Sequence, residues 1–371
     1  MSIFILLMFF VLELLWIPIN ADDFPTLGIS PCVYSGSYDE SGAYGYVLPM
    51  PVSSLPMECT SFIYDGIIYD NSSDINPPPA SLKIMNAFKA SGKRFFLIYT
   101  HGSLTQWMSS LDSSVDIETE ALSSFIKDSA ASGIILKDLD YNYDANLSYH
   151  VDTNFYSNLN KTILCMKQSI IGLKIGIYVN ASNIIYHYSN ASSQDFFDFT
   201  VLNDAVDFYI IEFDGFNECN DQFRGGIVPL CGPKSLVTFA EAFQCSTIAK
   251  NKIYLEFSAN PTPDITENNL PLCGMSYQKL CEDSKSLKMW CADNSDSLYY
   301  KGQFAKVTIN AQGIVVKYID TIDPAGSCNC DYKNQFITFQ MLLRGFKNVD
   351  NIKDCTSIND FTKVKCSDDG N

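Results

Sequence analysis

Carboxylates are concentrated at one point of the chain, where residues 137–144 read KDLDYNYD. Asp138, Asp140 and Asp144 lie there within seven residues, directly after an apolar run. In a strand, Asp138, Asp140 and Asn142 would share one side, because side chains alternate between the two faces. Three interpretations are open: a calcium loop, a solvated acidic turn, and the degenerate catalytic strand of a carbohydrate hydrolase.

A calcium loop is excluded by two positions. The D-x-[DN]-x-[DN]-G pattern requires Gly at its sixth position and Glu at its twelfth, where this chain has Tyr143 and Tyr149. Other metal sites are disfavoured as well, because the three histidines are scattered and no C-x-x-C pair occurs. We therefore expect neither a metal nor another cofactor.

The acidic cluster follows an apolar run, and such runs recur along the chain. Most of them are nearly continuous rather than alternating, which is typical of parallel strands covered on both faces. The predicted strands are Leu27–Tyr34, Phe62–Tyr69, Phe95–Tyr99, Gly133–Leu139, Leu173–Val179, Val206–Phe213, Ile253–Phe257 and Ile314–Ile319. Helical patterns lie between several of them, at Ile117–Ala131, Lys234–Phe243 and Phe336–Leu343. In the first helix, one buried face would hold Ile117, Ala121, Leu122, Phe125 and Ser129.

Eight strands that alternate with helices predict an α/β fold, the (β/α)8 TIM barrel. An open doubly wound sheet is the alternative, but no glycine-rich phosphate loop follows the first strand. Residues 258–312 separate the last two strands and contain three cysteines, so we expect a small disulfide-rich insertion there. The barrel would span residues 22–355, with a C-terminal tail over 356–371. Active sites of such barrels lie at the carboxyl ends of the strands, where the acidic cluster falls.

The N-terminus and the cysteines predict a secreted, extracellular protein. Ile3–Leu12 is an unbroken apolar run, and we interpret residues 1–21 as a signal peptide, with a signal anchor as the alternative. The 13 cysteines would then meet an oxidising compartment, where disulfides are the default. Their odd number leaves at least one unpaired, for which we choose Cys165 in a predicted helix. Five glycosylation sequons fit the same location: Asn71, Asn146, Asn160, Asn180 and Asn190.

The charge balance excludes two classes of partner. The chain has 42 Asp and Glu against 25 Lys and Arg, a formal net charge of -17. Nucleic-acid binding needs a basic face, and so does docking on an anionic membrane. We expect neither partner for the mature chain.

Over nearly its whole mature length the chain resembles the family 18 glycoside hydrolases, the chitinases. The segment from Gly133 to Tyr143 resembles the strand-4 signature D-G-x-D-x-D-x-E, and Ile211–Asp214 resembles the M-x-Y-D of strand 6. Other segments match in order: Cys32–Tyr34, Cys59–Tyr64, Ser276–Cys281, Tyr299–Gly302 and Gly313–Asp320. The resemblance implies a disulfide between Cys32 and Cys59. It also implies substrate-binding roles for Tyr64, Tyr141, Phe213, Asp214 and Lys317.

The departures from the family pattern bear on catalysis. Family chitinases protonate the glycosidic oxygen with the last Glu of the signature, while the acetamide of the sugar attacks the anomeric carbon. Aligned on its acidic end, this chain keeps Asp138 and Asp140 but has Asn142 in place of the acid. Aligned on Gly133 instead, the acid position falls on Leu139. We favour the first alignment because it keeps D-x-D. Two further positions depart: Lys317 stands where the family has a Trp, and Phe213 replaces a Tyr.

Loss of a general acid lowers a rate by about 10²- to 10⁴-fold. The sequence therefore favours a catalytically inactive protein that binds chitin or N-acetylglucosamine oligosaccharides. A weak or altered hydrolase is the first alternative, with Asp144 as the candidate substitute acid. Glu212 is a weaker substitute, since strand alternation in M-x-Y-D turns it away from the pocket. A barrel scaffold that binds an extracellular protein is the second alternative.

Overall fold

The computed structural model of the chain describes part of its 371 residues. The described residues are 26–36, 50–68, 75, 77, 79–113, 115–140, 151, 154–189, 198–216, 228–263, 276–282, 290–323, 326–328, 330, 335–352, 355 and 358. Several predicted features lie outside them: the signal peptide, Tyr141, Asn142, Asp144, the sequons at Asn71, Asn146 and Asn190, and most of the C-terminal tail. These remain predictions.

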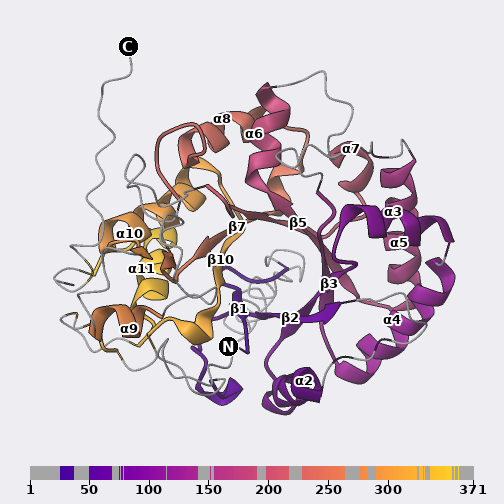
Figure 1. The fold of residues 1–371 in the computed structure, drawn as a ribbon, viewed down its shortest axis with the longest axis horizontal. Coiled ribbons are helices and arrows are strands. Elements are labelled where there is room, and N and C mark those ends of the chain that lie inside the picture. Colours follow the sequence, from indigo (N-terminus) through magenta and orange to yellow (C-terminus); the bar gives the residue numbers. More distant parts are fainter. Residues whose placement is uncertain are drawn as a thin grey trace, which may run out of the picture.

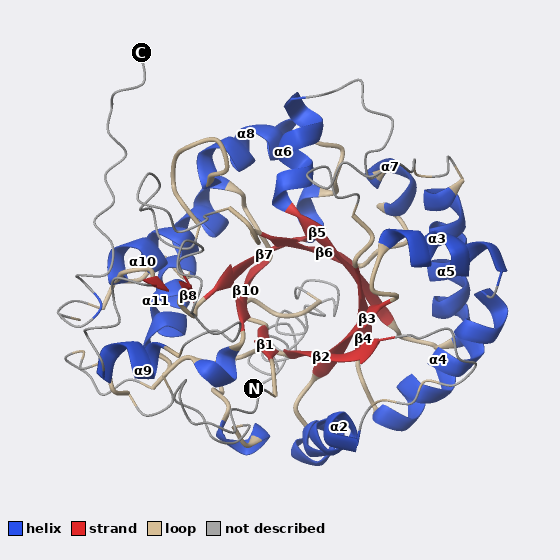
Figure 2. Ribbon diagram, in the orientation of Figure 1, coloured by secondary structure: helices blue, strands red, loops and turns tan. Residues whose placement is uncertain are grey.

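Eight parallel strands of the described chain close into a barrel in the order β1-β10-β7-β6-β5-β4-β3-β2 (Figures 1 and 2). They are β1 (Cys32–Tyr34), β2 (Phe62–Ile68), β3 (Phe95–Thr100), β4 (Gly133–Lys137), β5 (Lys174–Asn180), β6 (Phe208–Glu212), β7 (Ile253–Ser258) and β10 (Gly313–Lys317). Each coincides with one of the eight predicted runs, which confirms the TIM-barrel prediction.

Helices surround the barrel and cover its outer face (Figure 2). They are α2 (Pro79–Ser91), α3 (Leu104–Ser113), α4 (Val115–Ser129), α5 (Phe155–Ser169), α6 (Ala181–Ser189), α7 (Phe199–Leu202), α8 (Leu236–Cys245), α9 (Tyr277–Glu282), α10 (Ser295–Gln303) and α11 (Ile337–Phe346). Shorter helical turns also occur in the described part of the chain: 3-10 turns at Val52–Ser54, Lys250–Lys252 and Ile319–Thr321, and a π-helical turn at Phe304–Thr308. Within the described ranges, no helix combines the length and the apolarity needed to cross a bilayer.

Large aromatic rings fill the amino-terminal half of the barrel interior, and glycines make room for them. Phe96, Phe208 and Tyr254 belong to the interior cluster, and two edge-to-face contacts join the three rings. A Cβ on Gly133 would lie 2.9 Å from the ring of Phe96, and one on Gly176 would lie 2.1 Å from the ring of Phe208. The interior is thus packed at this end, as in other barrels of the class.

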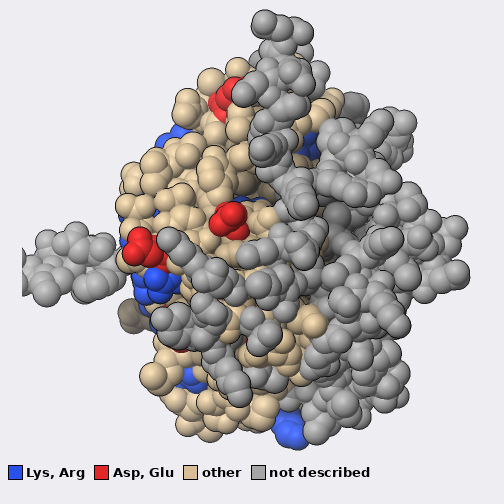
Figure 3. All heavy atoms as spheres, turned by 90° about the vertical axis from the view of Figure 1, so that its left-hand side faces the viewer, with Lys and Arg blue, Asp and Glu red and all other residues tan. Residues whose placement is uncertain are grey.

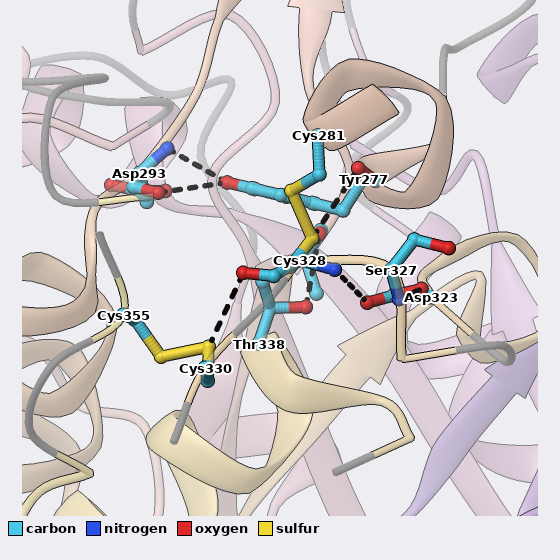
Figure 4. Close-up of a disulfide and its surroundings, with 10 residues drawn as sticks. Tyr277, Cys281, Asp293, Asp323, Ser327, Cys328, Cys330, Thr338 and Cys355 are labelled. Carbon is cyan, nitrogen blue, oxygen red and sulfur yellow. Dashed lines mark hydrogen bonds between the residues drawn. A yellow bond between two sulfur atoms is a disulfide. The ribbon is translucent and has the colours of Figure 1, made fainter. Parts of the chain in front are cut away.

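The insertion between β7 and β10 carries a two-stranded antiparallel sheet of β8 (Thr262–Pro263) and β9 (Trp290–Cys291), followed by α10. A disulfide joins Cys281 of α9 to Cys328, which follows the last barrel strand (Figure 4). A second bridge, Cys330–Cys355, lies beside it.

An ion pair is buried within the insertion. Lys301 of α10 lies 2.6 Å from Asp293, and their side chains are 2% and 0% exposed. The Tyr277 hydroxyl points at Asp293 (Figure 4) and donates to its backbone oxygen at 3.0 Å. The pair therefore ties α10 to the segment that precedes it and, through Tyr277, to α9.

Two predictions about cysteines are tested by the described residues. Cys32 and Cys59 form the implied disulfide, with their Cα atoms 5.7 Å apart. Cys165 is free, as expected, and lies half-buried in α5. Cys245 at the end of α8 is also free, and it is exposed, which the sequence did not predict.

Helix α4 is present, but its buried face differs from the predicted one. Ile117 is 58% exposed, whereas Glu118 and Leu122 are buried. The face is rotated because Glu118 accepts hydrogen bonds from the Tyr99 and Ser110 hydroxyls, each at 2.5 Å, and is bonded to His101 Nε2 at 2.8 Å. Burial acts to raise the pKa of Glu118, but His101, Ser110 and Tyr99 together hold it below the ordinary value.

The described part of the surface shown in Figure 3 is mostly uncharged. Acidic and basic side chains are scattered over that face, with no large patch of either sign.

Candidate functional site

Five polar side chains point into the carboxyl end of the barrel. Lys137, Tyr178, Glu212, Glu256 and Lys317 come from β4, β5, β6, β7 and β10. Tyr178 itself belongs to the interior cluster, and each of the other four stands two positions after an interior residue, namely Ile135, Ile210, Tyr254 and Val315. Because strand side chains alternate, all five share the inner face. We call this set, together with Asp214, the mouth cluster.

The mouth cluster is connected by ion pairs and one tyrosine hydrogen bond. Lys317 Nζ donates to both carboxylate oxygens of Asp214, at 2.9 and 2.7 Å, and lies 3.8 Å from Glu256. The Tyr178 hydroxyl donates to Glu256 at 2.7 Å. Lys137 Nζ lies 3.7 Å from Glu212 and 5.2 Å from the centre of the Tyr178 ring.

Burial shifts the protonation of these groups. It raises the pKa of Glu212 to about 8, against the lowering effect of Lys137, and Asp214 and Glu256 raise it further. Burial also raises the pKa of Glu256, which is 3% exposed. Burial acts to lower the pKa of Lys317, but Glu256 and Asp214 outweigh it and hold the ammonium form. Strongly perturbed carboxyls at the functional end of a barrel are typical of binding and catalytic sites.

The acidic cluster that opened the sequence analysis is arranged differently from the prediction. Strand β4 ends at Lys137, and Asp138 has a left-handed backbone, with φ 60°. Asp138, which is exposed, accepts a hydrogen bond from Thr100 at 2.5 Å. Asp140 instead accepts the backbone N–H of Asn180 at 2.6 Å, and burial raises its pKa to about 7. Strand alternation therefore does not extend to these two residues, and they engage different neighbours.

The residues of β4 that point into the barrel are those that the alignment on Gly133 places there. Gly133 faces inward, since its Cβ would meet the Phe96 ring, and Ile135 and Lys137 follow at alternate positions. The alignment on Gly133 places these two where the family has its aspartates, and Leu139, fully buried outside the barrel, at the acid position. The alignment that keeps D-x-D, which the sequence favours, has Asn142 at the acid position, and Asn142 lies outside the described residues.

Two predicted sugar-binding aromatics face away from the mouth cluster. Phe213 packs outside the barrel against Phe257 at 5.5 Å and Phe239 of α8 at 5.1 Å. Tyr64 also lies outside, where its hydroxyl donates to Ser81 of α2 at 3.1 Å. The expected orientation of β6 is thus reversed: Glu212 points inward and Phe213 outward. Asp214 and Lys317 are the predicted binding residues that the structure brings together.

Three members of the mouth cluster were missed from the sequence: Lys137, Tyr178 and Glu256. The available signal was one charged residue in an otherwise apolar strand, such as Glu256 in Ile253–Ser258. Of the two described sequons, Asn160 lies half-buried in α5 and Asn180 at the end of β5, where its side-chain oxygen accepts from the N–H of Ser182. No group of His, Cys, Asp and Glu among the described residues could hold a metal ion.

Comparisons by sequence find no relative: no family model and no curated protein matches. Comparison by structure places the chain among the chitinase folds. Catalytic domain 2 of the Group II chitinase of Ostrinia furnacalis, solved as a mutant with a bound chito-oligosaccharide, has a TM-score of 0.65 at 11% identity, covering 91% of this chain and 100% of that one. The Group IV chitinase of the same insect gives 0.64 at 14% identity, covering 86% and 99%.

Human YKL-39, described as a pseudo-chitinase with retained chito-oligosaccharide binding, gives a TM-score of 0.63 at 12% identity, covering 86% of this chain and 99% of that one. The chain therefore has a barrel fold like that of these chitinases. At these identities the similarity establishes the fold alone, and a chitinase and a pseudo-chitinase share it.

Proposed function

We propose that this chain is a secreted, glycosylated protein that binds chitin or N-acetylglucosamine oligosaccharides at the mouth cluster and does not hydrolyse them. The proposal is supported by a fold shared with chitinases and with a chito-oligosaccharide-binding pseudo-chitinase. It is further supported by the polar groups that converge at the carboxyl ends of the strands, where barrels of this class bind their ligands.

The observation that carries the loss of hydrolysis is the pair of inward-facing lysines. Glycoside hydrolysis passes through a transition state with positive charge on the sugar. Lys137 and Lys317 bring two ammonium groups to the carboxyl end of the barrel, where barrels of this class bind their ligands. In the alignment on Gly133, Lys137 also replaces an aspartate whose family role is stabilising.

Two assays test the proposal. Retention of the protein on chitin beads, with release by soluble chitotetraose, is the expected binding result. Asp214→Ala should weaken retention, because it frees Lys317 and removes an exposed acceptor from the mouth. Asp128→Ala is the matched control, since this exposed carboxylate lies in α4 near the amino end of β4. If the wild-type chain is not retained, the result favours the alternative in which the barrel is a scaffold that binds another protein.

One observation favours hydrolysis as a second candidate. Glu212 faces inward and keeps a proton near neutral pH, so it has the protonation that a general acid needs. A fluorogenic chitotriose separates the two functions. We expect no turnover above buffer, whereas turnover that disappears in Glu212→Gln would establish an altered hydrolase.

A further inference from the structure

Glu212 has the poorest electrostatic compensation in the mouth cluster. Its Oε2 atom is buried and has no hydrogen-bond partner among the described residues. Lys137, the nearest cation, lies 3.7 Å away, which is beyond hydrogen-bond length. By contrast, Asp214 receives two hydrogen bonds from Lys317, and Glu256 receives one from Tyr178.

A count of charges assigns a proton to this carboxyl. Among the described residues, the groups that face Glu212 are Lys137 from β4, Tyr178 from β5, Asp214 beyond β6, Glu256 from β7 and Lys317 from β10. The two ammonium groups of this described set do not neutralise its three carboxylates, and a buried ion without a partner neutralises itself by taking up a proton. The proton goes to the carboxyl with the weakest partners, which is Glu212. Burial, which raises its pKa to about 8, agrees with this assignment.

A neutral carboxyl is a hydrogen-bond donor that needs an acceptor. Leaving a buried donor unpaired costs about 1–3 kcal/mol, so a ligand that supplies an acceptor is favoured by that amount. An uncharged amide carbonyl is such an acceptor, and an N-acetylated sugar carries one on every residue. An ammonium group, as in a deacetylated sugar, has no acceptor to offer and would also meet Lys137 and Lys317.

We propose that Glu212, in its protonated form, donates a hydrogen bond to the amide carbonyl of the bound sugar, so that binding favours N-acetylated over deacetylated oligosaccharides and weakens in alkaline solution. This rests on the proposed binding function and adds the residue and the chemical group that select the ligand. No covalent bond is made or broken, and the proton stays on Glu212.

The first test is calorimetric titration with chitotetraose between pH 6 and pH 9.5. For one linked proton, the wild-type Kd should be about tenfold higher at pH 9 than at pH 6. Glu212→Gln keeps a donor that does not titrate, so its Kd should stay within about threefold of the wild-type value at pH 6 and show no pH dependence. Glu212→Ala should bind weakly at every pH. Glu241→Gln, at an exposed position of α8, should keep the wild-type profile.

The outcomes separate this inference from the function on which it rests. No binding by the wild-type chain at any pH refutes both. Binding without pH dependence, or with the wild-type dependence retained in Glu212→Gln, refutes only the role of Glu212. Equal affinity for chitotetraose and its deacetylated form does the same.

A second measurement needs no ligand. The infrared difference spectrum of wild type minus Glu212→Gln at pH 7 should contain the carbonyl band of a protonated carboxyl. A carboxylate band in its place overturns the proposal even where the variant binds poorly. Equal far-ultraviolet circular dichroism of the two proteins confirms that the variant folds.

Discussion

Replacing Lys301 by Met should strongly destabilise the insertion, because it leaves the carboxylate of Asp293 buried without its cation. Among the described residues, the remaining hydrogen bond to the Asp293 side chain would be the one from the Ser297 hydroxyl at 2.6 Å. Removal of one partner from a buried ion pair costs about 3–5 kcal/mol. Unfolding entropy is about 2.1 cal/mol/K per residue, so a loss of 3 kcal/mol in a chain of this length lowers Tm by about 4 °C.

The double variant distinguishes an unpaired charge from lost packing. In Lys301→Met with Asp293→Leu, no ion is buried, and we expect at least half of the lost stability to return. Differential scanning fluorimetry gives Tm, and urea titration gives the free energy of unfolding. Lys347→Met, at an exposed position after α11, is the control and should stay within about 0.5 kcal/mol of wild type. The reasoning fails if Lys301→Met matches that control, or if the double variant is no more stable than the single one.

Three further predictions concern other parts of the barrel. Because the pKa of Glu118 is lowered in the folded protein, its carboxylate stabilises the protein above the unfolded value of 4.5, and that stability is lost as pH falls through the folded pKa. Glu118→Gln should therefore lower Tm at pH 7 and flatten the acid side of a plot of Tm against pH. An unchanged acid side would contradict this. Cys245 should react with a thiol reagent in the native protein faster than half-buried Cys165; Cys245→Ser should remove the fast phase, whose persistence would disprove the assignment. Gly133→Ala should lower the free energy of unfolding by about 3 kcal/mol or more, since its Cβ would lie 2.2 Å from the Lys174 carbonyl oxygen. Gly172→Ala, which has open space around it and φ +83°, should lower it by only about 1–2 kcal/mol. Equal losses of the two variants in urea titrations would refute the packing argument.

The strands could be predicted because a strand that is buried on both faces consists of a nearly continuous run of apolar residues. The same property hides which face is which. Inward Ile210 in β6 and outward Phe213 directly after it are both apolar, so only the fold reveals that Glu212 points into the barrel. A single charged residue within an apolar run was the usable signal.

The end of a strand is also poorly marked in the sequence. In the sequence, Asp138 and Asp140 continue the alternation of side chains between the two faces of β4. In the structure, Asp138 has a left-handed backbone conformation, which ends that alternation. Aspartate adopts that conformation more readily than most residues, so no sequence rule forbids or requires it. In α4, the buried face contains Glu118, and an apolar periodicity cannot detect a carboxylate whose partners come from β3 and α3.

The Cys281–Cys328 bridge encloses β10, the last strand of the barrel, in a covalent ring. Closing a ring over a sequence separation of 47 residues removes unfolded-chain entropy worth about 4 kcal/mol at 25 °C. The ring also fixes how the chain responds to proteases. One cut anywhere between the two cysteines opens the ring without separating the pieces, so the nicked protein migrates as a full-length chain until it is reduced. Electrophoresis with and without a reducing agent would thus reveal damage that gel filtration cannot detect.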